Sequence, residues 1–202
     1  MKYIVCNLKN HLNEFNINDY INTIQKITYK NVIFCIDKKY INLFKNYKLC
    51  TQNYYDDLKK EYVLIGHYEK KESKEEIKEK ITKALNQKIK VILCIGNENI
   101  KDYKSIKKQI SYYLDKESNN IIIAYEPYNM IGSKENINID DLTNIVKNIK
   151  KDFNDIKVLY GGNVNEKNIN EIIEITDGVL IARLSYNPHK LTNILNKIKK
   201  SI

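Results

Sequence analysis

The stretch IIIAYEPYNMIGS, residues 121–133, carries the clearest signal in the chain. An apolar, β-branched run ends there in a carboxylate, Glu126, and Pro127 follows directly. A carboxylate at the exit of a buried strand is costly to place unless it is paired or used in chemistry. Pro127 stops the strand, and the short segment that closes on Gly132 and Ser133 suits a mobile cover whose backbone N–H groups are free to bind an anion. The stretch predicts a base beneath a lid.

Length and composition bound the class of protein. At 202 residues, with 43% hydrophobic and 10% aromatic residues, the chain is expected to be globular and to form one domain with a full core. It has no run of about 18 apolar residues and its start turns polar early, so we expect no membrane span, no signal peptide and a cytosolic (cytoplasmic) location. The four cysteines lie in apolar strand-like runs without CxxC spacing, which favours buried, reduced thiols over a metal site or disulfides; they are Cys6, Cys35, Cys50 and Cys94.

The formal net charge of +9 raises the question of a nucleic acid partner. The lysines are scattered over helix faces and interleaved with Glu and Asp, as in ESKEEIKEKITK, and no basic block stands alone. The abundance of Asn, Ile, Lys and Tyr throughout is typical of a composition that has drifted across a whole genome. We therefore expect no nucleic acid partner, while attraction of a small anionic substrate is compatible with the charge.

Short apolar runs alternate with longer amphipathic segments from end to end. The strand-like runs are residues 3–9, 31–37, 47–53, 62–67, 90–96, 121–127, 156–162 and 178–184. Helical spacing of apolar residues marks segments between them, including residues 75–85, 106–114 and 142–149. Eight near-continuous apolar strands followed by helices predict an α/β protein whose parallel sheet closes into a (β/α)8 barrel, with residues 1–202 as a single domain. The covering elements after the second and third strands are expected to be very short.

The chain contains six glycines, and most of them fall at one kind of position. Five lie at or just beyond the carboxyl end of a predicted strand: Gly66, Gly96, Gly132, Gly161 and Gly162. One such glycine is an ordinary turn residue. In a barrel of this type, however, the carboxyl ends of the strands form the active face, and glycine allows the backbone to approach a ligand closely. Five glycines on one rim therefore indicate a ligand site there.

Chemically useful side chains gather at the same rim. They are Asn7 and Lys9 at the first strand, His67 at the fourth, Glu126 at the sixth, residues 160–164 at the seventh and residues 182–185 at the eighth. Alternation along the first strand places Asn7 and Lys9 on the same side. A lone His beyond a strand is usually structural, and a lone Lys on a strand is usually a solvated rim residue. Barrel closure gives the combination its meaning, because it brings all these strand ends around one mouth.

Several of these segments match motifs of one family in the same order along the whole chain. They are Asn7-Leu8-Lys9, Gly66-His67-Tyr68-Glu69, the run Ile92–Gly96, Tyr125-Glu126-Pro127, Ile131-Gly132 and Tyr160-Gly161-Gly162. Together they resemble the triosephosphate isomerase family and imply its TIM barrel. Leu8 stands where the family has an aromatic residue, Tyr68 stands where it has serine, and Asn97 stands where it has glutamate.

The resemblance implies an aldose–ketose isomerase that uses no cofactor and no metal and acts in glycolysis and gluconeogenesis. Its substrate is a small phosphorylated triose, converted between dihydroxyacetone phosphate and D-glyceraldehyde 3-phosphate through an enediolate. Such chemistry needs a base for a carbon-bound proton and groups that polarise the neighbouring carbonyl. By resemblance Glu126 is the base and neutral His67 the electrophile. Lys9 supplies positive charge, Asn7 donates a hydrogen bond, and Glu69 supports them by pairing with a nearby lysine.

The resemblance also implies a lid over residues 127–134, which excludes water and protects the intermediate from losing phosphate. Its members include Pro127, Ile131, Gly132 and Ser133, and the seventh-strand loop with Tyr160, Gly161 and Gly162 supports the site from the other side.

The phosphate end departs from the family pattern. Gly132 is kept, whereas the serine of the seventh loop is Asn163 and the glycine pair after the eighth strand is Ala182-Arg183. Arg183 is the only arginine in the chain. Our hypothesis is that its guanidinium replaces lost backbone contacts, since arginine grips phosphate in a bidentate way. The alternatives are that Arg183 blocks the substrate or points outwards.

Assembly departs as well. In the family a long loop after the third strand inserts into the neighbouring subunit beside its catalytic lysine. Here only Tyr54 to Glu61 separate Asn53 from the fourth strand. We therefore expect a monomer, or a dimer built on another surface, in which Lys9 is less well supported.

Two other functions stay open at this point. The changes at Asn163, Ala182 and Arg183 are compatible with the same mechanism acting on a different phosphorylated or unphosphorylated aldose. A barrel retained as a non-catalytic binding protein is compatible with the missing loop, although such a protein gains nothing from a buried base.

Overall fold

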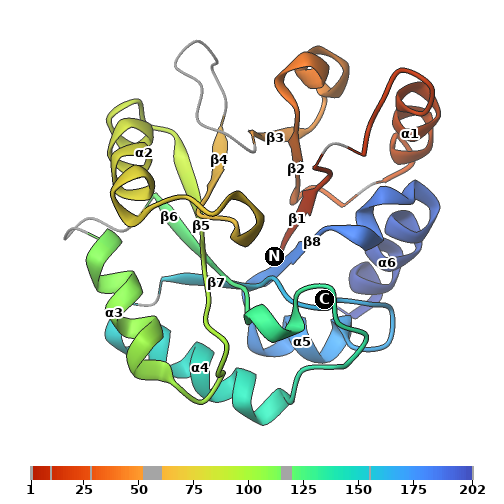
Figure 1. Ribbon diagram of the computed structural model, residues 1–202. Coiled ribbons are helices and arrows are strands. Elements are labelled where there is room, and N and C mark those ends of the chain that lie inside the picture. Colours follow the sequence, from red (N-terminus) through yellow and green to blue (C-terminus); the bar gives the residue numbers. More distant parts are fainter. Residues whose placement is uncertain are drawn as a thin grey trace.

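The computed structural model describes residues 2–9, 11–27, 29–51, 61–114, 120–154 and 156–201. Eight parallel strands close into a barrel in the order of the sequence (Figure 1). They are β1 (Tyr3–Asn7), β2 (Val32–Ile36), β3 (Lys48–Thr51), β4 (Tyr62–Ile65), β5 (Lys90–Ile95), β6 (Ile121–Tyr125), β7 (Lys157–Tyr160) and β8 (Gly178–Ile181). The predicted (β/α)8 barrel is confirmed.

Helices cover the outside of the barrel. The α-helices in the described part of the chain are α1 (Ile17–Ile24), α2 (Lys74–Asn86), α3 (Tyr103–Tyr113), α4 (Ile139–Asp152), α5 (Ile169–Ile175) and α6 (Pro188–Ser201). After β2 a 3-10 segment, η1 (Lys38–Phe44), takes the place of an α-helix, because residues 37–47 must leave one strand and enter the next. The short element predicted after the second strand is thus confirmed. The one predicted after the third strand lies in residues 52–60, outside the described ranges.

The local sequence explains where the helices begin. Ser73 caps α2, since its hydroxyl accepts from the Glu76 amide while the Glu76 carboxylate accepts from the Ser73 amide. Ile77, Ile81 and Ala84 then follow at helical spacing and are buried against the barrel. This cap fixes the helix directly after the loop that carries part of the site.

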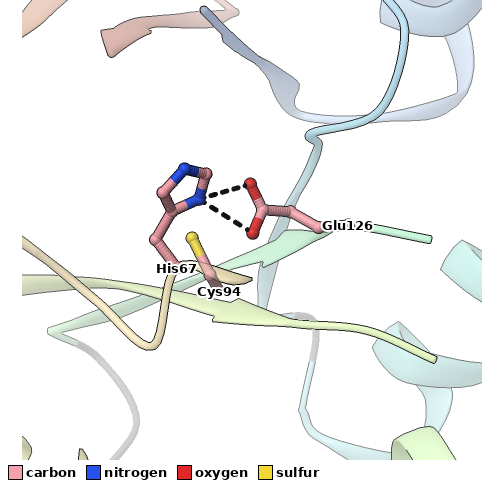
Figure 2. A group of neighbouring side chains, drawn as sticks. All are labelled: His67, Cys94 and Glu126. Carbon is pink, nitrogen blue, oxygen red and sulfur yellow. Dashed lines mark hydrogen bonds and ion pairs between the residues drawn. The ribbon is translucent and has the colours of Figure 1, made fainter. Parts of the chain in front are cut away.

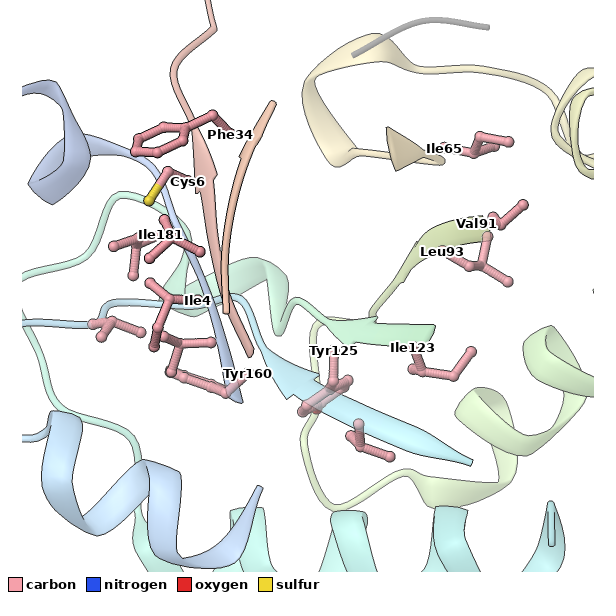
Figure 3. Packing of buried hydrophobic residues seen from close by; sticks show 14 of the residues in the cluster. Ile4, Cys6, Phe34, Ile65, Val91, Leu93, Ile123, Tyr125, Tyr160 and Ile181 are labelled. Carbon is pink, nitrogen blue, oxygen red and sulfur yellow. The ribbon is translucent and has the colours of Figure 1, made fainter. Parts of the chain in front are cut away.

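Side chains alternate between two apolar layers along each strand. One layer fills the barrel interior with Val5, Ile33, Cys35, Cys50, Tyr62, Leu64, Ile92, Cys94, Ile122, Ala124, Leu159 and Leu180. The other lies between the strands and the helices; Figure 3 labels Ile4, Phe34, Leu93, Ile123 and Tyr160 among its members. All four cysteines are buried thiols outside any disulfide, as predicted. Within the described residues, no helix combines the length and apolar character that a membrane crossing requires.

Gly178 allows the barrel to close. It opens β8 and pairs with Tyr3 of β1, at a φ of 153° that side chains rarely adopt. A Cβ at this position would lie 2.0 Å from the Tyr3 carbonyl oxygen. Both the Cβ and the Tyr3 carbonyl are fixed to paired backbone segments. Neither segment can move aside without opening the junction between the first and last strands.

We expect Gly178→Ala to lower the free energy of unfolding by about 2 kcal/mol or more, through backbone overlap and conformational strain. Urea unfolding measures the change. Gly132→Ala is the matched control: its φ of 77° is also positive, but its nearest neighbour is a side-chain atom 4.0 Å away. The control is expected to lose only about 1 kcal/mol. Equal losses in the two variants would show that overlap at the closure is unimportant.

Candidate active site

A cavity of about 240 Å³ opens at the carboxyl ends of the strands. The predicted residues that line it are Asn7, Lys9, His67, Glu69, Glu126, Ile131, Gly132, Gly161, Gly162, Asn163, Ala182 and Arg183. Pro127 and Ser133 lie in the adjoining loop and Tyr160 ends β7, and these three do not line it. Barrel closure has therefore brought most of the predicted residues around a single space.

A carboxylate and an imidazole form a buried pair in this cavity. Glu126 is 3% exposed and His67 is 8% exposed. The His67 Nδ1 atom lies 3.0 Å and 3.1 Å from the two carboxylate oxygens (Figure 2). The opposite ring nitrogen, Nε2, is buried and has no hydrogen-bond partner among the described residues. The pair is thus a hydrogen-bonded unit with one polar ring atom left to serve a ligand.

Gly96 allows Glu126 to take this position. A Cβ at Gly96 would lie 1.9 Å from the Glu126 carbonyl oxygen. The Glu126 amide donates to the Ile95 carbonyl at 2.8 Å, so the chain leaving β6 is held against the end of β5. Any side chain at residue 96 would push the carboxylate away from His67.

Cys94 lies directly below the pair (Figure 2). Its sulfur, the imidazole and the carboxylate have donor atoms within 4.8 Å of one another, and no other described His, Cys, Asp or Glu residues form a group this compact. Zinc accepts these donor types as ligands. Burial, and then the neighbouring Glu126, raises the pKa of the Cys94 thiol well above 9.0. At neutral pH Cys94 is therefore a protonated thiol that packs under the pair.

Lys9 and Glu69 form an ion pair on the next part of the rim. Lys9 lies two residues beyond β1 in a left-handed backbone conformation, with φ 47°, so it is not a strand residue as the alternation argument assumed. Asn7 and Lys9 nevertheless face the same cavity. Burial opposes ionisation of Glu69, but the hydrogen bond and charge of Lys9 outweigh it and lower the pKa of Glu69. A strained lysine held by an acid is typical of a functional site.

The lid begins with Pro127 and a short 3-10 segment, η3 (Tyr128–Met130), whose Met130 is buried. Two side chains, one from the loop after β7 and one from the loop after β8, bond to carbonyls farther along the chain. Asn163 Nδ2 donates to the Glu135 carbonyl at 2.9 Å, and Arg183 Nη2 donates to the Ser133 carbonyl at 3.2 Å. Arg183 thus spans from the exit of β8 to the lid.

Two arrangements were not predicted from the sequence. Cys94 was recognised only as a buried thiol; the signal for more was its place in β5, facing the barrel interior just before the strand ends. Asn163 was expected at the phosphate position, and its bond to the Glu135 carbonyl has no sequence signal.

A buried carboxylate paired with an imidazole, beside a lysine at the mouth of a (β/α)8 barrel, suits proton transfer next to a carbonyl, which is the chemistry of an isomerase. The sequence model of the triosephosphate isomerase family matches residues 50–198. The chain belongs to that family.

Individual relatives agree. The probable triosephosphate isomerase 2 of Listeria monocytogenes is 30% identical over 167 residues, which cover 72% of this chain and 66% of that protein. The triosephosphate isomerase of Helicobacter pylori is 33% identical over 159 residues, covering 72% of this chain and 68% of that protein. That of Orientia tsutsugamushi is 33% identical over 157 residues, covering 68% and 63%. The matches thus span about two thirds of the relatives' length.

The raised thiol pKa values predict a loss of stability in alkali. In the unfolded chain the thiols ionise near 9, whereas the folded state keeps Cys94 and Cys6 protonated because both are buried. The stabilising contribution is full below pH 9 and declines as pH rises further, by up to about 1.4 kcal/mol per pH unit for each thiol.

Urea unfolding between pH 8 and pH 10.5 measures this decline. Cys94→Ser and Cys6→Ser are each expected to reduce the slope, because serine does not titrate in this range. Cys6→Ser serves as the matched variant outside the group formed by His67, Cys94 and Glu126. Slopes identical to that of the parent in both variants would contradict the assignment.

Proposed function

We propose that this chain interconverts dihydroxyacetone phosphate and D-glyceraldehyde 3-phosphate, with Glu126 as the base, and so serves glycolysis and gluconeogenesis. The observation that carries the proposal is the buried Glu126–His67 pair, whose His67 Nε2 has no hydrogen-bond partner among the described residues. The cytoplasmic location expected from the sequence is part of the same proposal. The reaction is balanced by proton transfers alone and needs no cofactor.

The reaction begins with a rearrangement at the pair. In the ligand-free arrangement the Glu126 carboxylate accepts a hydrogen bond from His67 Nδ1, so it is not yet free to take a carbon-bound proton. Substrate must open this bond. Glu126 then removes a proton from the carbon next to the carbonyl, an enediolate forms, and the same carboxylate returns the proton to the neighbouring carbon. Neutral His67 carries its single ring proton on Nδ1 in this arrangement, because the carboxylate can only accept. Once the pair has opened, that N–H donates to the substrate oxygen, and the ring exchanges this proton with the substrate.

Positive charge and hydrogen bonds stabilise the enediolate in this scheme. Lys9 lines the cavity, and its ammonium group is paired with Glu69. The other oxygen of Glu69 lies 3.7 Å from His67 Nε2, so the lysine is near the Glu126–His67 pair. Asn7 is 1% exposed and lines the same space. We assign Lys9 to the developing oxyanion and Asn7 to a hydrogen bond with it, because groups fixed in advance lose little energy by reorganising.

We assign the phosphate end to the opposite wall. Gly132, Asn163, Ala182 and Arg183 all line that wall, and the lid over residues 127–134 adjoins it. The Asn163 side chain bonds to the Glu135 carbonyl just beyond the lid, which leaves its backbone as the part offered to phosphate. Closure of the lid over the bound substrate would exclude water and protect the enediolate from phosphate loss.

We expect Glu126→Asp to lower the turnover number for D-glyceraldehyde 3-phosphate by about 100-fold or more. Shortening the side chain by one methylene moves the carboxylate by roughly 1 Å from the carbon-bound proton, and such displacements cost about this much. A coupled assay that consumes dihydroxyacetone phosphate measures the rate. Glu79→Asp, an exposed change on α2, is the matched control and is expected to keep parental activity. A parent no faster than Glu126→Asp would remove this function in favour of another sugar substrate or a non-catalytic role.

We also propose that the chain is a monomer or a dimer built on a surface other than the family's. The support is the short segment between β3 and β4, whose residues 52–60 lie outside the described ranges. Sedimentation velocity at micromolar concentration is expected to give a monomer of 23.9 kDa. A stable dimer whose cross-links map to residues 54–61 would contradict the proposal.

A further inference from the structure

Arg183 is the fixed cation of the cavity that has no carboxylate within ion-pair distance among the described residues. The other fixed cation, Lys9, is paired with Glu69. Negative charge at the opposite end comes from Glu126 and Glu69. The cavity is therefore polarised, with its uncompensated positive charge at the exit of β8.

The arginine is also in contact with the lid. Its Nη2 atom donates to the Ser133 carbonyl at 3.2 Å and would lie 4.0 Å from a Cβ placed on Gly132. That separation is ordinary van der Waals contact, so the guanidinium lies directly against this part of the lid. A guanidinium carries five N–H donors, so the bond to Ser133 leaves others for a ligand in the same plane.

The neighbouring side chain does not compete for this role. Asn163 Nδ2 donates to the Glu135 carbonyl, beyond the lid, and an amide carries no net charge. Ala182 has no polar side chain. The side-chain charge available to an anion at this end of the cavity is that of Arg183.

We propose that Arg183 is the specificity residue for the anionic end of the substrate, and that it couples anion binding to the position of the lid. The ligand class is a phosphate monoester dianion. The guanidinium binds the phosphate oxygens while one of its N–H groups holds the Ser133 carbonyl, so the bound anion and the lid share one rigid group. The inference rests on the proposed function, which it deepens at the phosphate end.

The choice of arginine matters for this coupling. A lysine ammonium is a compact charge with rotating donors, whereas a guanidinium presents parallel donors in a fixed plane. The guanidinium can therefore hold the phosphate oxygens and the Ser133 carbonyl in one fixed geometry, which an ammonium group does not impose. Arg183→Lys is therefore expected to keep part of the anion affinity and to lose the coupling.

The first test is direct binding of sn-glycerol 3-phosphate, a non-reactive phosphorylated triose analogue, measured by calorimetry. Arg183→Ala is expected to weaken binding about 10- to 100-fold, the range for charge-assisted hydrogen bonds, and Arg183→Lys less. Lys147→Ala, which removes an exposed cation on α4, is the matched control and is expected to stay within about twofold of the parent, since an exposed charge outside the cavity is screened. Unchanged affinity in Arg183→Ala would overturn the inference.

A second readout separates recognition from a merely structural role. The ratio of kcat/KM for D-glyceraldehyde 3-phosphate to that for unphosphorylated D-glyceraldehyde is expected to fall about 10- to 100-fold in Arg183→Ala. General damage to the site would lower both values and leave the ratio intact, which would overturn the inference.

Hydrogen exchange tests the coupling itself. Glycerol 3-phosphate is expected to protect the amides of residues 131–135 in the parent and not in Arg183→Lys. Equal protection in both proteins would overturn the coupling.

The outcomes also distinguish this inference from the proposed reaction. A parent inactive on the triose phosphate that still binds glycerol 3-phosphate through Arg183 would support the anion site and remove the reaction. An active parent whose Arg183→Ala variant keeps its substrate ratio would support the reaction and remove the inference.

Discussion

Closure of the barrel is the constraint on which the site depends. Lys9, His67, Glu126 and Arg183 lie far apart in the sequence, on loops that follow four different strands. They meet because β8 pairs with β1 and completes the ring. That pairing requires Gly178, since a side chain there would overlap the backbone of Tyr3. The stability of the closed sheet and the geometry of the cavity therefore have one common origin.

Within the closed barrel, the buried Glu126–His67 pair is an expensive feature that the fold must support. A carboxylate that is 3% exposed loses most of its hydration, and only part of that loss is offset by the bond to the imidazole. Gly96 and the strand-end hydrogen bond to Ile95 hold the carboxylate in place from behind. An apolar side chain in place of the Glu126 carboxylate would cost less desolvation free energy. The local structure therefore supports a group that stability alone does not require.

Sequence reasoning succeeded where the signal was periodic or local. Apolar runs located all eight strands, and the acid–proline step at Glu126 marked the cavity correctly. It failed where a side chain's direction depends on contacts between distant elements. Lys9 was assigned by strand alternation, yet β1 ends two residues earlier and a left-handed backbone aims it into the cavity. Cys94 and Asn163 acquire their partners only through the juxtaposition of β5 with β6 and of the seventh loop with the lid.

The two ends of the cavity rest on different physical principles. At the carbonyl end, side chains are held by burial and by short bonds to one another, so their geometry is set before a ligand arrives. At the other end, the positive charge sits on one long, solvent-accessible side chain, that of Arg183. Such a side chain loses rotamer entropy when it binds, and its bond to Ser133 has already restricted it in the ligand-free protein. The lid contact therefore reduces the entropy that anion binding must overcome, and it offers a physical reason why a flexible arginine can serve as an anion site.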